Sequence, residues 1–169
     1  EVNFSQYWKG SVTQFVQLVQ KPAYEVLHAM GETVVGSCIS YSLNKVQEQI
    51  DAGYLIYCDI ASYHHYGWNA QSQLNSFKAV KQLMGDKPLC ISEWSLEPGN
   101  ATDQEFVAML NQNRAWVLKN TESAFFYRIS YFNGHGTGAS VLDASLRPRA
   151  TFYNMFKTWT NELNDLLAR

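Results

Sequence analysis

The first hydrophobic pattern along the chain has helical spacing. Between residues 7 and 30, apolar side chains recur every three or four positions, as on one face of an amphipathic helix. Pro22 lies inside this pattern, so we expect either a kink there or two helices that abut. Gly31 suits the end of the helix. The expected apolar face consists of Phe15, Leu18, Val19, Val26, Leu27 and Met30.

Four later segments have the pattern of buried strands, because they are apolar and rich in β-branched or aromatic residues. They lie in residues 33–40, 54–66, 89–93 and 123–132. The third of these strands follows a helix-breaking Asp-Lys-Pro and ends in the carboxylate of Glu93. A carboxylate at the end of a buried strand is costly unless it meets water, a partner group or a substrate.

Helical patterns separate these strands. One covers residues 44–52 and ends at Gly53, and a second precedes Gly85. A third begins at residues 102–105, where Thr102 and Glu105 have the spacing of a capping box. The helix before Gly85 has apolar residues at Leu74, Phe77, Val80 and Met84. The helix after the capping box has them at Phe106, Val107, Leu110 and Val117. A final helix is predicted from Phe152, Phe156, Trp159, Leu163 and Leu166.

The order of these elements predicts an α/β fold. Strands that alternate with helices form parallel sheets with right-handed helical crossovers. No linker or shift in composition interrupts the chain, so residues 1–169 are expected to form a single domain. Four strands with five helices fit either a small open sheet or half of an eight-stranded (β/α)8 TIM barrel, and the pattern alone does not separate the two.

Composition narrows the possible partners. The chain is 46% hydrophobic and 14% aromatic, which indicates a globular protein. Its net charge of −2 and the absence of a basic run argue against a nucleic-acid partner, and no apolar run is long enough to predict a membrane span. The chain starts at Glu1 without Met or a signal-like segment, so we expect a processed product or a piece of something longer. Its compartment stays open, with a secreted or extracellular protein slightly favoured.

The three cysteines do not indicate a metal or cofactor. Cys38, Cys58 and Cys90 each lie inside an apolar run, far apart and without metal-ligand spacing, so we expect buried free thiols. A zinc site built from His64 and His65 is not expected either, because neighbouring strand residues point to opposite faces.

Polar and aromatic residues collect where the predicted strands end. In a parallel sheet or barrel the carboxyl ends of the strands share one rim, where active sites are built. Two carboxylates there can hydrolyse a glycoside, one as acid and the other as nucleophile, while aromatic rings pack on the sugar. The residues expected at this rim are Glu1, Ser40, Tyr41, His64, His65, Tyr66, Trp68, Glu93, Trp94, Tyr131, Phe132 and Asn133.

Four segments resemble the clan A glycoside hydrolases, which are retaining (β/α)8-barrel enzymes. The N-terminal Glu-Val-Asn-Phe is similar to the end of their Asn-Glu-Pro-Asn motif on the fourth strand, although Val2 stands where Pro is commoner. Residues 59–66 resemble the sixth strand, residues 91–94 the seventh strand with its nucleophile, and residues 141–153 the segment before the last helix. The resemblance spans the chain but covers only strands 5–8 of such a barrel, its C-terminal half.

The resemblance implies roles for individual residues. Glu93 would be the nucleophile, with Glu97 as the alternative, and Glu1 the general acid/base. Tyr66 would hydrogen-bond to Glu93, and His64 would contact substrate or a catalytic carboxylate. The other residues expected to bind substrate are Trp68, Trp94, Tyr131 and Asn133. The implied partners are a carbohydrate and the missing half of the barrel or a second copy of the chain, with no cofactor or metal.

Two other interpretations stay open. A half-barrel lacks the strands that form the other side of the cleft, which leaves open a non-catalytic carbohydrate-binding or inactive module instead of an enzyme. An esterase of the α/β-hydrolase type would need a Gly-x-Ser-x-Gly elbow, and the sequence has none.

Overall fold

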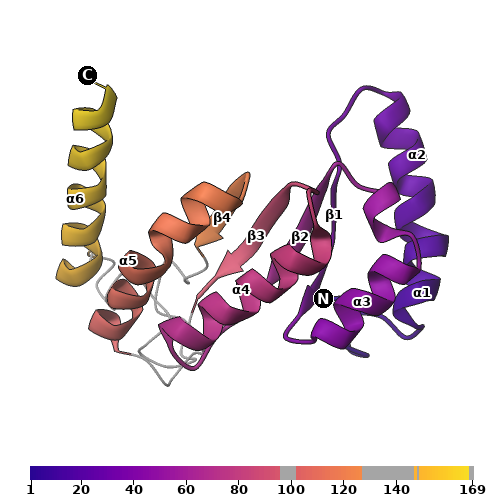
Figure 1. The fold of residues 1–169 in the computed structure, drawn as a ribbon, viewed down its shortest axis with the longest axis horizontal. Coiled ribbons are helices and arrows are strands. Elements are labelled where there is room, and N and C mark those ends of the chain that lie inside the picture. The colour runs from indigo at the N-terminus through magenta and orange to yellow at the C-terminus, as the bar shows by residue number, and fades with distance from the viewer. Residues whose placement is uncertain (96–101, 127–146, 148, 168–169) are drawn as a thin grey trace.

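The computed structural model describes residues 1–95, 102–126, 147 and 149–167. The described chain is an α/β structure, as the element order predicted (Figure 1). Its helices are α1 (Val12–Phe15), α2 (Lys21–Ala29), α3 (Leu43–Asp51), α4 (Ala70–Met84), α5 (Asp103–Asn120) and α6 (Ala150–Leu167), with a π-helical turn η1 (Val16–Gln20) and a 3-10 turn η2 (Tyr54–Ile56). Its strands are β1 (Val35–Ser40), β2 (Ile60–His64), β3 (Leu89–Trp94) and β4 (Ser123–Phe126).

The four described strands form one parallel sheet in the order β1-β2-β3-β4. Each strand therefore pairs with the next one along the chain, as repeated βα units require. At the carboxyl ends, Ser40 pairs with His64, and His64 pairs with Glu93. The sheet thus brings residues at or next to the carboxyl ends of three consecutive strands to one edge.

The helices form a layer against this sheet. Right-handed crossovers between successive parallel strands place α3, α4 and α5 on the same face. In Figure 1 the helices follow an arc from α1 and α2 through α3 and α4 to α5 and α6. Neighbouring helices of this arc contact one another, and their buried side chains meet those of the sheet. The core includes Ile39, Val46, Tyr63, Phe77, Ile91, Phe106 and Leu110.

The first helical segment differs from the expected one. It begins at Val12, after the Ser11 cap, and the π-helical turn η1 precedes Pro22 in the first turn of α2. A π-helical turn contains an extra residue, so it rotates the side chains that follow. Val12 and Val16 are buried, whereas most of the predicted apolar face is exposed, with Leu18 at 68% and Met30 at 70%. The predicted face is therefore wrong except for the half-buried Phe15.

The second strand lies within the predicted residues 54–66 and occupies Ile60–His64. Gly53 ends α3 with a left-handed backbone (φ 95°), and residues 54–56 turn as η2 before β2 starts at Ile60. The fully buried Tyr54 directs this turn: its hydroxyl accepts a hydrogen bond from Ser62 N at 2.7 Å. Gly36 of β1 leaves room for the ring, because a Cβ there would lie 2.5 Å from that hydroxyl.

The later elements follow the predictions more closely. The capping box at the start of α5 is confirmed: Thr102 Oγ1 accepts from Glu105 N at 3.2 Å, and the Glu105 carboxylate accepts from Thr102 N at 2.7 Å. In α6, Phe152 is buried as expected, but Phe156 is exposed. The rest of the predicted fourth strand and the side chains of Leu163 and Leu166 lie outside the described residues. None of the helices in the described ranges is long and apolar enough to cross a membrane.

Candidate active site

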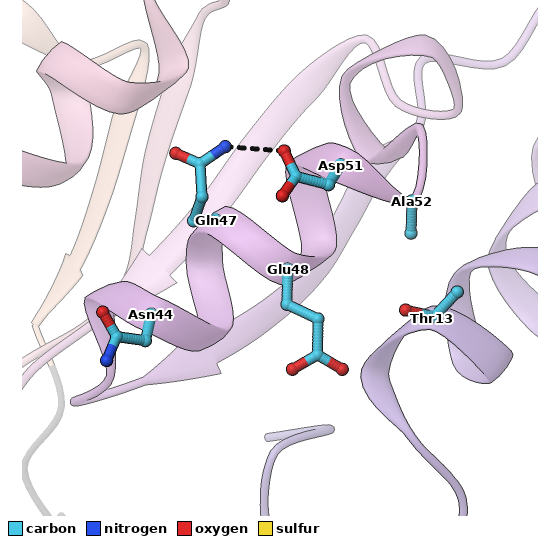
Figure 2. Close-up of a pocket in the computed structure, with 6 residues that line it drawn as sticks. All are labelled: Thr13, Asn44, Gln47, Glu48, Asp51 and Ala52. Atoms are coloured by element: carbon cyan, nitrogen blue, oxygen red, sulfur yellow. Dashed lines mark hydrogen bonds between the residues drawn. The ribbon is translucent and has the colours of Figure 1, made fainter.

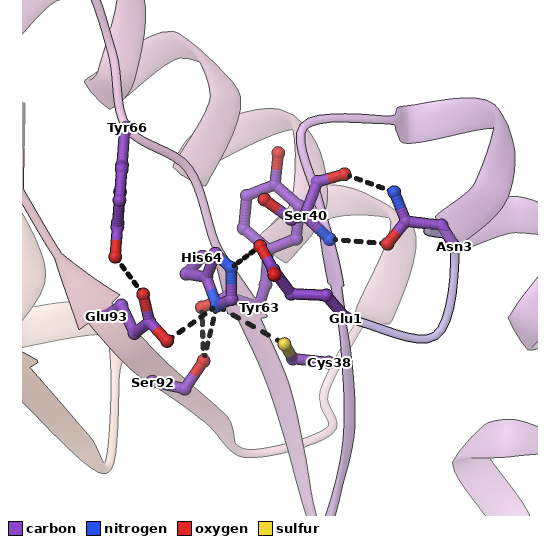
Figure 3. A network of polar contacts seen from close by, with 9 residues as sticks. All are labelled: Glu1, Asn3, Cys38, Ser40, Tyr63, His64, Tyr66, Ser92 and Glu93. Carbon is purple, nitrogen blue, oxygen red and sulfur yellow. Dashed lines mark hydrogen bonds and ion pairs between the residues drawn. The ribbon is translucent and has the colours of Figure 1, made fainter. Parts of the chain in front are cut away.

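His64 is the centre of a polar network at the carboxyl ends of the strands (Figure 3). It is the last residue of β2 and is only 1% exposed. Its two ring nitrogens face groups from β1, β3 and the N-terminal segment. A buried imidazole needs hydrogen-bond partners for both nitrogens, and here both are satisfied.

The N-terminal segment is held along β1, which fixes Glu1. Val2 N donates to Cys38 O at 3.4 Å. The Asn3 side chain donates to Ser40 O at 2.9 Å and accepts from Ser40 N at 3.1 Å. These contacts bring Glu1 Oε1 to 2.9 Å from His64 Nε2. Glu1 therefore lies at the same edge as the strand ends, with its side chain 26% exposed.

Glu93 reaches the other side of the imidazole from β3. Its Oε1 lies 4.0 Å from His64 Nδ1, and its Oε2 accepts a hydrogen bond from the Tyr66 hydroxyl. The pairing of β2 with β3 shifts between Tyr63 and His64, which inserts one residue into β3. Such a bulge bends the strand locally. It lets both Ser92 and Glu93 approach His64.

Two further side chains surround His64 Nδ1. Ser92 Oγ lies 3.2 Å away and Cys38 Sγ lies 3.3 Å away. Ser92 Oγ also lies 3.5 Å from Tyr63 O, to which it donates. The hydroxyl can thus accept a hydrogen bond from Nδ1–H while it donates to the backbone. With Glu1 at Nε2, this arrangement suits an imidazole that carries protons on both nitrogens.

The charges around His64 favour its protonated form. Burial lowers the pKa of His64, but the contacts with Cys38 Sγ and with the Glu1 and Glu93 carboxylates outweigh burial and raise the pKa to about 9. Burial raises the pKa of the Cys38 thiol, yet the hydrogen bond and charge of His64 outweigh it and lower that pKa below its usual value. At neutral pH the imidazole of His64, which lies between Glu1 and Glu93, therefore carries a positive charge.

Of the two tryptophans expected to line sugar subsites, Trp94 is buried, whereas the role of Trp68 stays a prediction. Trp94 is 5% exposed, and its indole Nε1 donates to Gln73 Oε1 of α4 at 2.9 Å, so its ring belongs to the core instead of lining a sugar subsite. Trp68 is 73% exposed, in the loop between β2 and α4. Tyr131, Asn133 and the alternative nucleophile Glu97 lie outside the described residues. Among the described residues with predicted roles, Glu1, His64, Tyr66 and Glu93 lie together at this site.

Sequence reasoning missed three members of the network. Asn3, Cys38 and Ser92 were not predicted as site residues, although each contacts the site directly. Cys38 lies two positions before the strand end at Ser40, on the face that the pleat gives to alternate residues. The alternation along β1 was a signal that could have found it. Cys58 and Cys90 are buried and free as expected, and Cys38 is free but only half-buried.

Two shallow hollows lie away from this network. One, of about 370 Å³, lies between α1 and α3 and is lined by Thr13 and the exposed side of α3 (Figure 2). The other, of about 380 Å³, lies between α5 and α6. Neither is lined by Glu1, His64 or Glu93. In the described part of the chain, no group of three or more His, Cys, Asp or Glu residues is arranged to hold a metal ion.

Comparisons with known proteins define the fold. No protein-family model and no curated protein sequence matches the chain. A GH128 (subgroup VI) exo-beta-1,3-glucanase from Aureobasidium namibiae is similar in structure, with a TM-score of 0.69 over 86% of this chain and 61% of that one, at 10% identity. A GH128 (subgroup III) curdlan-specific exo-beta-1,3-glucanase from Blastomyces gilchristii, in complex with glucose, is also similar. Its TM-score is 0.53 over 75% of this chain and 59% of that one, at 16% identity.

These likenesses show that the chain has the α/β fold of part of two glycoside hydrolases. The chain spans about three fifths of the length of each, 61% and 59%. At this level of identity the comparison extends to the arrangement of helices and strands, while chemistry has to be argued from the site itself.

Proposed function

We propose that the natural polypeptide carrying this chain is a retaining O-glycoside hydrolase that uses Glu93 and Glu1. The observation that supports this most is the position of these two carboxylates on either side of the buried His64 (Figure 3). They are 92 positions apart in sequence (93 − 1). Glu93 lies near the carboxyl end of β3, and Glu1 belongs to the N-terminal segment that is held beside the carboxyl end of β1. Paired carboxylates at such an edge suit hydrolysis of a glycosidic bond.

The proposed reaction has two displacements. In the first, the Glu93 carboxylate attacks the anomeric carbon and a bond from that carbon to Glu93 forms. The bond to the leaving oxygen breaks as Glu1, which receives a proton from the His64 imidazolium, gives that oxygen a proton. In the second, Glu1 takes a proton from water, the water oxygen attacks the same carbon, and the bond to Glu93 breaks. Two inversions restore the original configuration of the sugar.

The neighbouring residues have supporting roles in this scheme. The Tyr66 hydroxyl donates to Glu93 Oε2 and so orients the other oxygen, Oε1, toward the sugar. The His64 imidazolium lies between the two carboxylates and offsets part of their mutual repulsion. Its contact with Glu1 also provides a group that can hold the proton which Glu1 delivers and recovers.

We further propose that the domain is the C-terminal half of a (β/α)8 barrel, with β1 to β4 as strands 5–8. Support comes from the sequential parallel order of the strands and from the two glucanases, which are longer than the matched region. An open four-stranded sheet leaves two edges that must be paired or covered. The exposed side chains of Leu18, Val26 and Met30 also suit contact with further helices. The remainder of the same barrel, or a second copy of the chain, would supply strands for the sheet edges and helices to cover these exposed side chains.

We propose the substrate class from the two similar glucanase structures. Both are named exo-beta-1,3-glucanases, and one was solved with glucose. Glucans with β-1,3 linkages are therefore the first substrates to test. A sugar held against Glu93 would meet the phenol of Tyr66 and the ring of Tyr41, which packs 6.2 Å from that of Tyr66.

A non-catalytic carbohydrate-binding module is the second candidate. It is favoured by the coverage of the two glucanases, because the chain matches only about three fifths of each, 61% and 59%. Part of the cleft would then be absent from a protein made of this domain alone. Such a module would bind β-1,3-glucan without releasing sugar.

The test compares hydrolysis of β-1,3-linked glucose oligosaccharides by the natural polypeptide and two variants. Glu93→Gln removes the proposed nucleophile, and Glu48→Gln alters a carboxylate on the outer face of α3. We expect the first variant to lose turnover by on the order of 10⁴-fold or more, and the second to keep it. Unchanged turnover in Glu93→Gln would remove Glu93 from the mechanism, and binding without any turnover by the unmodified protein would favour the module.

A further inference from the structure

Gln73 is fully buried near the start of α4, and each of the two polar atoms of its side chain makes two hydrogen bonds. Its Nε2 donates to His65 O at 3.0 Å and to Ser95 O. Its Oε1 accepts from Trp94 Nε1 at 2.9 Å and from Asn113 Nδ2 at 3.2 Å. These four bonds use the two amide protons and two acceptor positions of the side chain, so one orientation of the amide satisfies all of its partners.

The partners of Gln73 flank two residues of the candidate site. His65 immediately precedes Tyr66, and Trp94 and Ser95 immediately follow Glu93. The Gln73 side chain therefore links the backbone just before Tyr66 to the backbone just after Glu93. The hydrogen bond between Tyr66 and Glu93 spans the same two segments. Gln73 thus clamps the two chain segments whose separation determines that bond.

The surrounding chain is adapted to this clamp. Gly67 lies between Tyr66 and the N-cap of α4, and a Cβ at that position would come within 2.7 Å of Gln73 Cβ and 2.9 Å of Gln73 N. The missing side chain lets the first turn of α4 approach the loop closely. Asn113 of α5 braces the same turn, because its Nδ2 also donates to Ala70 O at 3.0 Å. Helices α4 and α5 therefore both fix the Gln73 amide.

We infer that Gln73 is a positioning residue, which acts on the reaction through the contact between Tyr66 and Glu93. This inference rests on the proposed function. A buried amide with four partners also stabilises the fold, since removing it leaves buried polar groups unpaired. A test must therefore separate an effect on catalysis from a loss of stability.

Gln73→Met keeps the length of the side chain and removes all four bonds. Gln49→Met is the matched control, because Gln49 is also fully buried in a helix and donates to Ser37 O of β1 at 3.1 Å, away from Tyr66 and Glu93. We expect Gln73→Met to lower kcat on a β-1,3-linked oligosaccharide by ~10- to 100-fold with KM little changed, because small misplacements of reacting groups have effects of that size. Gln49→Met should lose stability but keep kcat.

A double-mutant cycle with Tyr66→Phe gives the decisive comparison. If Gln73 acts through the phenol, the pair Gln73→Met and Tyr66→Phe lowers kcat no more than the stronger single change. Additive losses would overturn the inference, because they would show that Gln73 acts independently of Tyr66. Should Gln73→Met fail to fold, Trp94→Phe removes the 2.9 Å bond between the indole and Gln73, together with part of a buried ring. It enters the same cycle with Tyr66→Phe, with the same two outcomes.

A readout without turnover separates this inference from the proposed function. The ¹³Cζ chemical shift of labelled Tyr66 reports the hydrogen bond of its hydroxyl in the absence of sugar. We expect Gln73→Met, but not Gln49→Met, to move this shift toward its value in Glu93→Gln. An unchanged shift would overturn the inference even in an active glycosidase. A moved shift in a protein without glycosidase activity would support the clamp and defeat only the proposed function.

Discussion

His64 Nε2 lies 2.9 Å from Glu1 Oε1, although 63 positions separate the two residues. The contact joins the N-terminal segment to the end of β2 and depends on the hydrogen bonds of Val2 and Asn3 to β1. It places the Glu1 carboxylate against Nε2 of the His64 imidazole, whose Nδ1 faces the Glu93 carboxylate. The proposed chemistry depends on this relationship, because it brings two acidic groups to one charged ring.

The Tyr66 hydroxyl should matter for the chemical step more than for binding. Tyr66→Phe removes the bond to Glu93 Oε2 and leaves the ring in place. Hydrogen bonds to a charged group contribute roughly 1.5–3 kcal/mol, so we expect kcat to fall ~10- to 100-fold with little change in KM. Steady-state kinetics on an aryl glycoside would measure both constants. A variant that raises KM alone would show that Tyr66 binds sugar without orienting the nucleophile.

Folding stability should depend on pH through His64. Its pKa is about 9 in the folded protein, against 6.5 for an exposed histidine. Because the folded pKa is the higher one, the stabilisation is fully present below pH 6.5 and is lost as the pH rises through about 9. The loss should be at most on the order of 3 kcal/mol.

Urea unfolding of the protein between pH 6 and 10 would measure this dependence. The variant His64→Gln is the control, since it cannot titrate and should show a flatter profile over the same range. A protein that becomes more stable between pH 6.5 and 9 in a His64-dependent way would contradict the assignment of a raised pKa.

Cys38 should be more reactive than Cys58. The contact with His64 lowers the pKa of the Cys38 thiol, whereas burial raises the pKa of Cys58 to about 11. The thiolate is the nucleophile, so iodoacetamide should label Cys38 first in the folded protein near pH 7.5. Peptide mass spectrometry over time would measure both rates. Labelling of Cys58 at an equal or higher rate would show that the thiol of Cys38 is not activated by His64.

The chain in isolation should self-associate. Leu18, Val26 and Met30 expose 68%, 61% and 70% of their surface, and β1 and β4 form the edges of the sheet. Exposed apolar groups and open strand edges favour association between molecules. Light scattering of residues 1–169 after gel filtration should therefore show dimers or larger species. A monodisperse monomer that unfolds cooperatively would contradict the half-barrel and favour a small complete sheet.

The sequence predicted the elements whose signals are local. The capping box of Thr102 and Glu105 and the β-branched run before Ser40 specify their elements through neighbouring residues. The π-helical turn at Val16–Gln20 was not predictable in this way, because the helical spacing of apolar residues continues through it. Leu18 is exposed because Val16 and Gln20 are the buried residues of this turn, with Gln20 Nε2 donating to Tyr57 O before β2.

The candidate site was predictable where a residue's position followed from a strand end. His64 ends β2 and Glu93 lies one residue before the end of β3, and parallel pairing brings them together. Trp94 was misplaced because adjacent strand residues point to opposite faces, so the neighbour of an inward Glu93 turns toward the helices. The contact of Ser92 with His64 depends on the bulge in β3, and no local pattern in the sequence predicts that bulge.

The most direct test of the account is to trap the proposed covalent intermediate. A 2-deoxy-2-fluoro glucoside with an activated leaving group slows the second displacement, so the sugar should remain attached to the nucleophile. The natural polypeptide would be incubated with this reagent, digested and analysed by mass spectrometry, with Glu93→Gln as the control. The account predicts one added fluoroglucosyl group on Glu93 and none in the variant. Labelling of a different carboxylate, or an active enzyme that releases sugar of inverted configuration, would contradict it.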